Sequence, residues 1–337
     1  MEKHVAGIRA MKKVLVTGAT GFTGGKVAER LVADGNHVVA FVRHTSDTRA
    51  LEKLGIECRT VDLCDRDDVL ANFEGIRKVF HIAAAYRSEH ADQAEFHAVN
   101  VEATRHLLDA ALEKGVERFV HCSTVGVQGE IDIPPADENY RLKPGDHYQQ
   151  SKLDGELLAL EYFRERGLPG AVVRPVGIYG PGDTRFLKLF KSINKNRFFM
   201  IGDGQVLYHM TYIDDLVQGF MLAGEKEAAL GEVFTISGPD YTTINELVQE
   251  ISRILGKTPS RLKIPFHLVY GASVVCDKLC KLMKISPPLY PRRVEFFHLD
   301  RAFTSEKARK LLGYNPENNL AQGLRKTAQW YKDNGLL

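Results

Sequence analysis

The sequence predicts an α/β protein, built as a doubly wound parallel sheet with a smaller, mostly C-terminal α/β domain. Short apolar runs alternate with helical patterns over the first half of the chain, as they do in sheets of parallel strands. A glycine-spaced turn joins the first of these runs to the first helical pattern. The length, 337 residues, exceeds what one hydrophobic core usually organises, so a second and smaller domain is expected.

The first predicted strand and the turn after it form a candidate dinucleotide site. Residues 13–17 are a short apolar run typical of a strand buried on both faces, and a helical pattern of apolar residues follows at 27–32. Between them, Gly18 permits a tight turn, Gly21 lets the backbone approach a pyrophosphate, and Gly24 lets the helix pack on the strand. The predicted cofactor contacts in this turn are Gly18, Thr20, Gly21, Phe22, Thr23 and Gly24.

Tyr148 and Lys152 are the candidate acid/base pair. They are four residues apart in a predicted helix, so their side chains lie on one face. An ammonium group beside a phenol favours the phenolate and lowers the pKa of the phenol towards the working range of a general acid or base. A Tyr-x-x-x-Lys spacing also occurs on ordinary solvated helix faces, and the upstream glycine turn is what favours the catalytic interpretation.

Together, the Thr-Gly-x-x-Gly-x-x-Gly spacing and Tyr-x-x-x-Lys resemble the extended short-chain dehydrogenase/reductase superfamily, which includes the epimerase/dehydratase enzymes. The resemblance covers nearly the whole chain. It implies a dinucleotide-binding Rossmann domain at 11–178, to which about 206–237 return, and a substrate-binding domain at 179–205 and 238–337. Residues 1–12 carry charges but no apolar run, so we expect a loose extension rather than a signal peptide or membrane anchor.

The end of the second predicted strand bears on the choice of cofactor. Residues 37–42 end at Arg43, where an NAD-preferring site usually has an acid on the ribose hydroxyls. An arginine followed by His44, Thr45 and Ser46 suits a 2′-phosphate instead, so NADP is the predicted cofactor, with NAD as the other option. An exposed loop arginine without a ligand is the alternative interpretation.

The third and fourth predicted strands supply further cofactor contacts. By resemblance, the segment 61–63 contacts the adenine, and small residues closing the strand at 78–85 let the backbone approach the cofactor. Asn100 matches the family's Asn-Val-x-Gly-Thr, with Ala103 in place of glycine, and this resemblance implies that it helps position Lys152, directly or through water. A plain polar helix face is the alternative for Asn100. The predicted cofactor contacts here are Asp62, Leu63, Ala83, Ala84 and Ala85.

The fifth predicted strand, 118–124, delivers two hydroxyl groups to its carboxyl end, where ligands bind in open α/β sheets. The family pattern Ser-Ser-x-x-x-Val favours Thr124 as the catalytic hydroxyl and Ser123 as its neighbour, with the order uncertain by one position. The segment 171–183 resembles the family's Arg-Pro-x-x-x-Tyr-Gly-Pro-Gly, whose backbone frames the nicotinamide. Pro175 cannot donate to a strand ladder and therefore marks the exit from the sheet.

The substrate side is less regular. The cationic stretch 185–197 has the pattern of an amphipathic helix that could meet an anionic substrate or face water. Tyr208 stands where sugar-nucleotide enzymes of the family commonly carry an arginine for the diphosphate. This departure weakens the case for a sugar-nucleotide substrate. The predicted substrate contacts are Tyr86, Thr124, Tyr148, Arg185 and Tyr208.

The C-terminal part carries weaker signals. A late strand is expected within 232–238, a helix with a capping box from Thr243, a helix closing at Gly313, and a final helix over about 320–332. The apolar region 262–285 is interrupted by charges and too short to span a membrane. It is expected to be a packed helix, with a lid over a bulky apolar substrate as the alternative.

Composition limits the partners. Lys plus Arg number 45 and Asp plus Glu 43, a balance that argues against a nucleic-acid or membrane-surface protein. The five cysteines lack zinc-type spacing, so no metal is predicted, and their odd number suits reduced thiols in the cytoplasm. Family members often pair through two helices about a two-fold axis, which implies a homodimer. The apolar residues proposed for it are Val101, Leu107, Leu108, Ala111, Leu153, Leu157, Leu158 and Leu160.

Within the superfamily, the segments 42–49, 84–86 and 305–316 are most similar to bacterial proteins that resemble dihydroflavonol reductases, sterol dehydrogenases and hopanoid-associated sugar epimerases. The expected function is NAD(P)-linked hydride transfer to or from a secondary alcohol or ketone, with Tyr148 as acid/base. The alternative is a nucleotide-sugar epimerase or dehydratase that retains NAD. A non-catalytic NADP-sensing regulator is the third reading, although such proteins typically lose the tyrosine or lysine that this chain has.

Overall fold

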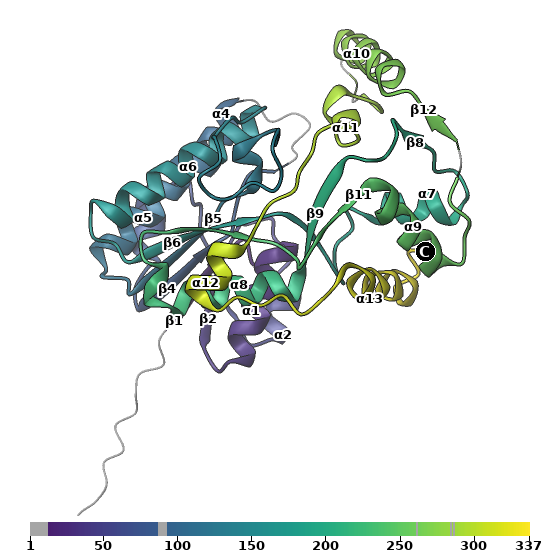
Figure 1. Cartoon of the computed structure of the whole chain (residues 1–337). Helices are drawn as coiled ribbons and strands as arrows, with labels where there is room; N and C mark the ends of the chain where they lie inside the picture. Colours follow the sequence, from purple (N-terminus) through teal and green to yellow (C-terminus); the bar gives the residue numbers. More distant parts are fainter. Residues whose placement is uncertain (1–12, 87–92, 261, 284, 286) are drawn as a thin grey trace, which may run out of the picture.

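A computed structural model of the chain describes residues 13–86, 93–260, 262–283, 285 and 287–337 (Figure 1). The predicted extension at 1–12 lies outside the described residues. Seven parallel strands form the large sheet, in the order β10-β6-β5-β4-β1-β2-β3, which confirms the doubly wound prediction. These strands are β1 Lys13–Thr17, β2 His37–Val42, β3 Glu57–Thr60, β4 Ile76–His81, β5 Arg118–Cys122, β6 Gly170–Pro175 and β10 Val233–Ile236.

Both faces of this sheet are covered, because successive residues of its strands point to opposite sides. Val14 and Val16 of β1 enter a core shared with α1 and α8, whereas Leu15 enters a second core shared with α5 and α6 (Figure 1). The two layers of helices explain why residues 38–42 of β2 are all apolar and buried. The helices of this part are α1 Phe22–Ala33, α2 Arg49–Lys53, α3 Arg66–Ala71, α4 Gln93–His97, α5 Ala103–Glu113, α6 His147–Arg164, α8 Ile213–Glu225 and α12 Glu306–Leu312. Short helical turns lie at Ala98–Glu102, Val125–Gln128 and Glu227–Ala229.

A smaller lobe follows β6 and is drawn on the right of Figure 1. It has a three-stranded sheet, β11-β9-β7, and a two-stranded one, β12-β8. Its strands are β7 Gly177–Tyr179, β8 Met200–Ile201, β9 Leu207–Tyr212, β11 Tyr241–Thr243 and β12 Lys263–Ile264. Its helices are α7 Leu187–Asn194, α9 Ile244–Leu255, α10 Phe266–Leu282, α11 Pro291–Glu295 and α13 Leu320–Asp333.

Several late signals are confirmed. Thr243 and Glu246 form the predicted capping box of α9, and α12 ends at Gly313 in the left-handed conformation, φ 73°. Within 206–237, α8 and β10 belong to the large sheet's layers, while β9 pairs with β7 and β11. The domain boundaries themselves stay a prediction.

Three strands of the large sheet end earlier than the apolar runs suggest. The segments 61–63, 82–85 and 123–124 lie beyond the last residues of β3, β4 and β5. At β4 the cause is local, because the backbone N–H groups of Ile82 and Ala83 donate to the Thr17 hydroxyl, at 3.1 and 3.2 Å, instead of continuing the ladder. The chain thus turns away from the sheet just where ligands bind in such folds.

Packing within the chain accounts for most of the residues proposed for a dimer. Seven of those eight side chains are buried in α5, α6 and the turn before α5, and only Leu157 is exposed, at 49%. Their apolar character therefore gives no sign of a second copy, and the homodimer stays a prediction. Among the described residues, no helix has both the length and the apolar character needed to cross a bilayer.

Gly155 allows α6 to approach the turn at Ala98–Glu102. A methyl group at this position would lie 2.4 Å from the carbonyl oxygen of Asn100, a backbone atom that cannot move without shifting the turn. Glycine inside a helix costs about 1 kcal/mol relative to alanine, so its presence in the middle of α6 reflects the close approach.

We therefore expect Gly155→Ala to lower the melting temperature, because an overpacking cost of about 1–3 kcal/mol outweighs the gain in helix propensity. Gly271→Ala is the matched control, since Gly271 is also helical but a methyl group there would meet nothing within 4 Å. Thermal unfolding followed by circular dichroism should show a loss for the first variant and none for the second. Equal melting temperatures for the two would refute the close-approach argument.

Candidate active site

The glycine turn has the geometry of a dinucleotide cradle. Gly18 has φ +72°, and a methyl group on it would lie 2.8 Å from the backbone nitrogen of Ala83. A methyl group on Gly24 would lie 2.2 Å from the carbonyl oxygen of Gly18. These contacts show why both positions need glycine: the first for the turn beside β4, the second for the contact of α1 with β1.

The start of α1 fits an anionic ligand. Gly21 caps the helix in an extended conformation, φ −89° and ψ 171°, with no side-chain cap, and the first turn has no acidic residue. The N–H groups of the first turn, at Phe22 and Thr23, are therefore available to a phosphate. Thr20 and Gly21 are exposed, so nothing in the described chain closes the approach to them.

The other predicted cofactor residues border the same edge of the sheet. Ala83, Ala84 and Ala85 follow β4 and are half-buried, and Asp62 and Leu63 follow β3. The Asp62 carboxylate accepts a hydrogen bond from the backbone N–H of Cys64, at 2.9 Å, which shapes the turn after β3. Pro175 is the last residue of β6 and pairs with Ile236.

Arg43 follows β2 and is exposed. Its guanidinium has no ion-pair or hydrogen-bond partner among the residues that the structure describes. Arg49, at the start of α2, differs, because it is paired with Asp47 at 2.5 Å. Arg43 is therefore the loop cation that a ligand could engage without first breaking an ion pair.

Helix α6 carries Tyr148 and Lys152. It begins at Asp146, whose carboxylate accepts from the Gln149 N–H at 2.8 Å. Lys152 is only 3% exposed, and its Nζ donates to the carbonyl oxygen of Cys122 at the end of β5, at 2.7 Å. Burial lowers the pKa of Lys152 from its ordinary value. Tyr148 lies on the same helix face, one turn nearer the N-terminus.

Two aromatic side chains, Tyr86 and Phe96, form a wall beside the Tyr148 ring. Tyr86 lies edge-on to it with ring centroids 5.1 Å apart, and Phe96 of α4 does so at 6.0 Å. Tyr86 is 43% exposed, so this wall has an open side. The predicted substrate residue Tyr86 therefore does lie beside the predicted acid/base.

The Asn100 side chain bonds to the segment after β4 and to α6, and its predicted help in positioning Lys152 stays a prediction. Its side chain accepts from the Ala85 N–H at 2.8 Å, and its amide donates to the Ser151 hydroxyl at 2.9 Å. It lies in the one described π-helical turn, Ala98–Glu102. Asn100 thus ties the segment after β4 to α6 one residue away from Lys152, whose ammonium is held by Cys122.

The two hydroxyls after β5 differ in surroundings. Thr124 is half-buried, and its Oγ1 accepts from the Gly126 N–H at 3.1 Å, which leaves its own O–H hydrogen to donate elsewhere. Ser123 is 4% exposed, and its Oγ is buried without a hydrogen-bond partner among the described residues. Thr124 is therefore the more accessible of the two hydroxyls.

A chain of hydrogen bonds that the sequence did not reveal runs beneath the site. The Thr104 hydroxyl donates to the Asn100 carbonyl at 2.9 Å, so it must accept from His81 Nε2, also at 2.9 Å. His81 Nδ1 then accepts from the Thr17 hydroxyl at 2.8 Å. Burial lowers the pKa of His81 to about 3, which keeps the ring neutral and the direction of the chain fixed. The sequence signal is a histidine at the end of β4, directly after the apolar Val79 and Phe80.

The remaining predicted substrate residues belong to the segments after β6. Arg185 is paired with the buried Asp183 at 2.5 Å, and its guanidinium lies 5.5 Å from the centre of the Phe22 ring. Tyr208 of β9 packs edge-on against Phe296, with ring centroids 4.9 Å apart. Arg185 therefore borders the start of α1, and Tyr208 packs inside the smaller lobe, against the end of α11.

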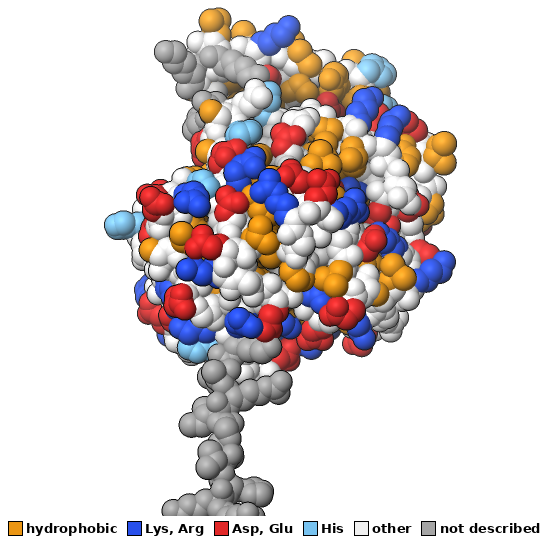
Figure 2. Space-filling model, turned by 90° about the vertical axis from the view of Figure 1, so that its left-hand side faces the viewer, with side chains coloured by type: hydrophobic (Ala, Val, Ile, Leu, Met, Phe, Trp, Pro, Cys, Tyr) orange, Lys and Arg blue, Asp and Glu red, His pale blue; other side chains and the backbone are white. Residues whose placement is uncertain are grey.

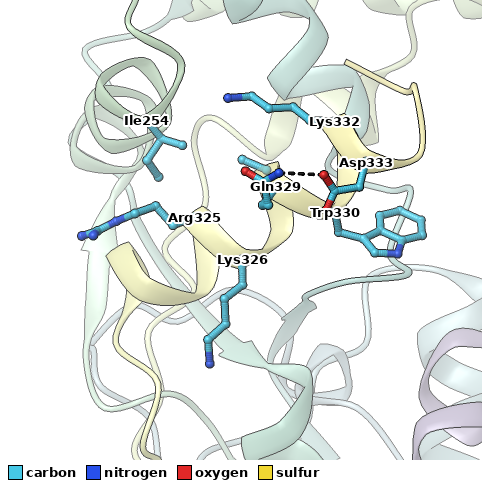
Figure 3. Close-up of a pocket in the computed structure, with 8 residues that line it drawn as sticks. Ile254, Arg325, Lys326, Gln329, Trp330, Lys332 and Asp333 are labelled. Atoms are coloured by element: carbon cyan, nitrogen blue, oxygen red, sulfur yellow. Dashed lines mark hydrogen bonds between the residues drawn. The ribbon is translucent and has the colours of Figure 1, made fainter.

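A surface hollow of about 560 Å³ lies between α9 and α13, lined by Ile254, Arg325, Trp330 and their neighbours (Figure 3). It shares no residue with the predicted site. The Gln329 amide and the Asp333 carboxylate within it are bonded to each other, at 2.7 Å. Across the described ranges, no three His, Cys, Asp or Glu side chains are grouped so as to hold a metal ion.

Hydride chemistry needs a bound dinucleotide and a proton donor at one edge of the sheet, and this chain offers a site for each. It is an NAD(P)-dependent enzyme of the extended short-chain dehydrogenase/reductase type. More particularly, residues 14–237 match the NAD dependent epimerase/dehydratase family, and the chain belongs to that family.

Individual relatives are named for sterol or steroid substrates and for a nucleotide sugar. The chain is 30% identical to sterol demethylase protein B of Methylococcus capsulatus, with 96% of this chain and 99% of the relative covered. It is 31% identical to 3-beta-hydroxysteroid dehydrogenase of Mycolicibacterium neoaurum, with 95% and 92% covered. Among solved structures, the dTDP-glucose 4,6-dehydratase DesIV of Streptomyces venezuelae, with NAD bound, superposes with a TM-score of 0.78 at 26% identity, with 96% and 97% covered.

The burial of His121 in β5 should make the stability of the protein depend on pH. The ring is fully buried beside Lys152 and His81, and neither of its nitrogens has a hydrogen-bond partner within the described part of the chain. Burial lowers the pKa of His121 well below its ordinary value, so the unfolded chain takes up a proton that the folded chain does not. Stability must therefore fall as the pH drops below about 6.5, the ordinary histidine value.

We expect His121→Leu to reduce the slope of the unfolding free energy between pH 6 and 5 by about 1 kcal/mol per pH unit. Leucine also removes two unsatisfied polar atoms, so stability at pH 7.5 should not fall. His44→Gln, which replaces an exposed imidazole, serves as the control. Denaturant titrations across this pH range give the slopes, and an unchanged slope for His121→Leu would contradict the argument.

Proposed function

We propose that the chain oxidises a secondary alcohol or reduces the matching ketone, with Tyr148 as the acid/base. The observation that carries this proposal is the convergence of α6, the end of β5 and the glycine turn at one edge of the sheet. When bound, the dinucleotide supplies the hydride acceptor or donor. The support for this reading comes from the geometry of the chain's own groups.

Each group has a distinct task in this proposal. The Tyr148 hydroxyl exchanges a proton with the substrate oxygen. The Thr124 hydroxyl donates to the same oxygen, since its bond with Gly126 is one in which it accepts and its own hydrogen stays available. Lys152 uses one of its three N–H hydrogens on Cys122, which leaves two for the ribose and for the electrostatic support of Tyr148. Asn100 holds the Tyr86 segment against α6.

The substrate that we favour is apolar. The relatives named for sterol and steroid substrates support this choice, as does the aromatic wall formed by Tyr86 and Phe96. Tyr208, in place of a cation, is a further argument against a diphosphate at that position. The second candidate is a nucleotide-sugar epimerase or dehydratase that retains NAD, which the similarity to DesIV favours.

The cofactor that the protein carries separates these candidates. Purification without added dinucleotide, followed by absorbance and mass spectrometry, identifies anything that stays bound. We expect a site that takes up and releases NADPH, as an enzyme that exchanges its cofactor in every cycle requires. Stoichiometric NAD that survives dialysis would reverse the order of the two candidates.

We propose NADP as the preferred cofactor and a cytoplasmic location. The unpaired Arg43 supports the first, although the structural relatives hold NAD. Five free thiols support the second, since a reducing compartment keeps them so. We also propose a homodimer, on the basis of the family resemblance. Of the eight apolar residues predicted for its interface, Leu157 is the exposed one.

Arg43→Ala should raise the KM for NADP by about 10- to 100-fold with little change for NAD, because only the 2′-phosphate loses a charged partner. Arg49→Ala is the control, since that arginine follows shortly after Arg43, at the start of α2, but is already paired with Asp47. Steady-state kinetics with both cofactors give the ratio. A wild-type preference for NAD, or an unchanged ratio in the variant, would refute the NADP assignment.

Tyr148→Phe should lower turnover by about two to four decades while cofactor affinity stays nearly intact, because only the proton-transferring oxygen is lost. Tyr331→Phe is the control, since its buried hydroxyl has no hydrogen-bond partner within the described ranges. Turnover is measured on a panel of sterols, ketones and sugar nucleotides, and affinity by isothermal titration. A fully active Tyr148→Phe variant would end this proposal, and tight binding without turnover by the wild type would favour a sensor.

A further inference from the structure

Helix α10 presents a stripe of exposed apolar side chains at the far end of the smaller lobe. Leu268 is 60% exposed, Val275 57%, Leu279 54% and Leu282 81%. With the exposed Ala272, they recur at the three- and four-residue spacing of one helix face, an arc roughly 100° wide. Figure 2 shows hydrophobic side chains gathered at the top of the molecule, where Figure 1 places α10. The packed-helix prediction for this region therefore describes only part of its surface.

The opposite face of α10 attaches it to the lobe. Phe266 stacks on His298 with ring centroids 4.2 Å apart, and Ser273 and Cys280 are buried at 0% and 6% exposure. These residues lie on the side of the helix away from the stripe. The helix therefore packs on the lobe without using the stripe. A continuous apolar stripe exposed to water is unusual on a protein surface and marks an interaction site.

The sequence that contains this helix is rich in positive charge. The segment 263–293 contains six Lys and Arg residues and one Asp, a net charge of +5 in a chain whose total is +2. The rest of the chain is therefore net −3. On α10 itself, the exposed Lys278 and His267 lie beside the apolar stripe. The near balance of the whole chain, which argued against membrane-surface binding, conceals this local excess.

We propose that α10 docks the protein on an anionic lipid bilayer, with the stripe of Leu268, Ala272, Val275, Leu279 and Leu282 entering the interface. An apolar helix face with the exposed Lys278 beside it, in a segment of net charge +5, has the pattern of helices that lie in the plane of a membrane surface. A second copy of the chain is a poorer occupant, because pairing two stripes would bring two segments of net charge +5 together. A spanning role is excluded for α10, since its length and apolar character do not suffice.

This docking does not depend on the reaction proposed above. It would, however, place the enzyme on the phase in which apolar alcohols and ketones dissolve. A chain of contacts leads from the helix towards the substrate side, because α10 packs on α11 and Phe296, just after α11, touches Tyr208.

Vesicle flotation tests the proposal directly. The full chain is mixed with vesicles of phosphatidylcholine plus phosphatidylglycerol, or of phosphatidylcholine alone, without substrate. We expect binding to the anionic vesicles that weakens with added salt, and a loss of about tenfold or more in Val275→Glu/Leu279→Glu. Leu311→Glu is the matched control, because Leu311 on α12 is similarly exposed, at 47%, but outside the stripe.

Two further measurements keep the outcome clear. Circular dichroism and cofactor titration test whether the double variant is folded. If the double variant does not fold, the single variant Leu279→Ser is used in its place. Light scattering gives the oligomeric state. Equal flotation of wild type and double variant, absence of binding to anionic vesicles, or a wild-type dimer that the double variant dissociates would each overturn the proposal, the last in favour of self-association.

Discussion

The buried ion pair between Arg174 and Glu156 fixes the helix on which the site depends. Arg174 is 3% exposed and Glu156 is not exposed at all, and the arginine Nε lies 3.0 Å from a carboxylate oxygen. Neither charge could stay in this environment without the other, so the pair defines one position of α6 on β6. One turn earlier, the ammonium of Lys152 is bound to Cys122. Two contacts, at Glu156 and at Lys152, therefore fix the rotation of α6 about its axis, and with it the direction in which Tyr148 points.

Side chains at strand ends connect this helix to the cofactor turn. His81 and Thr17 at the ends of β4 and β1 lead through Thr104 to the carbonyl of Asn100. The same Asn100 carbonyl is the atom that the missing side chain of Gly155 accommodates. The glycine turn and the acid/base helix are therefore not independent sites on a common scaffold. A change at the end of β1 reaches α6 through three hydrogen bonds and one close contact.

The large sheet was predictable because its signals are local. An apolar run followed by a glycine turn identifies β1 and α1, and the capping box identifies the start of α9, from a few neighbouring residues. The partners of Asn100 and the neutral state of His81 were not predictable, because both depend on residues far along the chain. The sequence predicted strand ends too far along the chain for the same reason. The run 78–85 stays apolar beyond His81, although the N–H groups of Ile82 and Ala83 already bond to the Thr17 hydroxyl and the strand has ended. The net charge of the whole chain, +2, does not show how charge is distributed along it, since residues 263–293 alone carry a net charge of +5.

The large sheet is completed late in synthesis. Strand β6 ends at Pro175, and its outer partner β10 starts only at Val233, after most of the smaller lobe's strands have been made. A nascent chain therefore contains the whole glycine turn and α6 while Val172 and Val173 still form an open edge. Unpaired backbone groups on an apolar edge strand invite pairing with another chain. At this stage, capture by a chaperone and aggregation compete with folding, so the rate at which residues 176–236 emerge sets the time for which the edge is open.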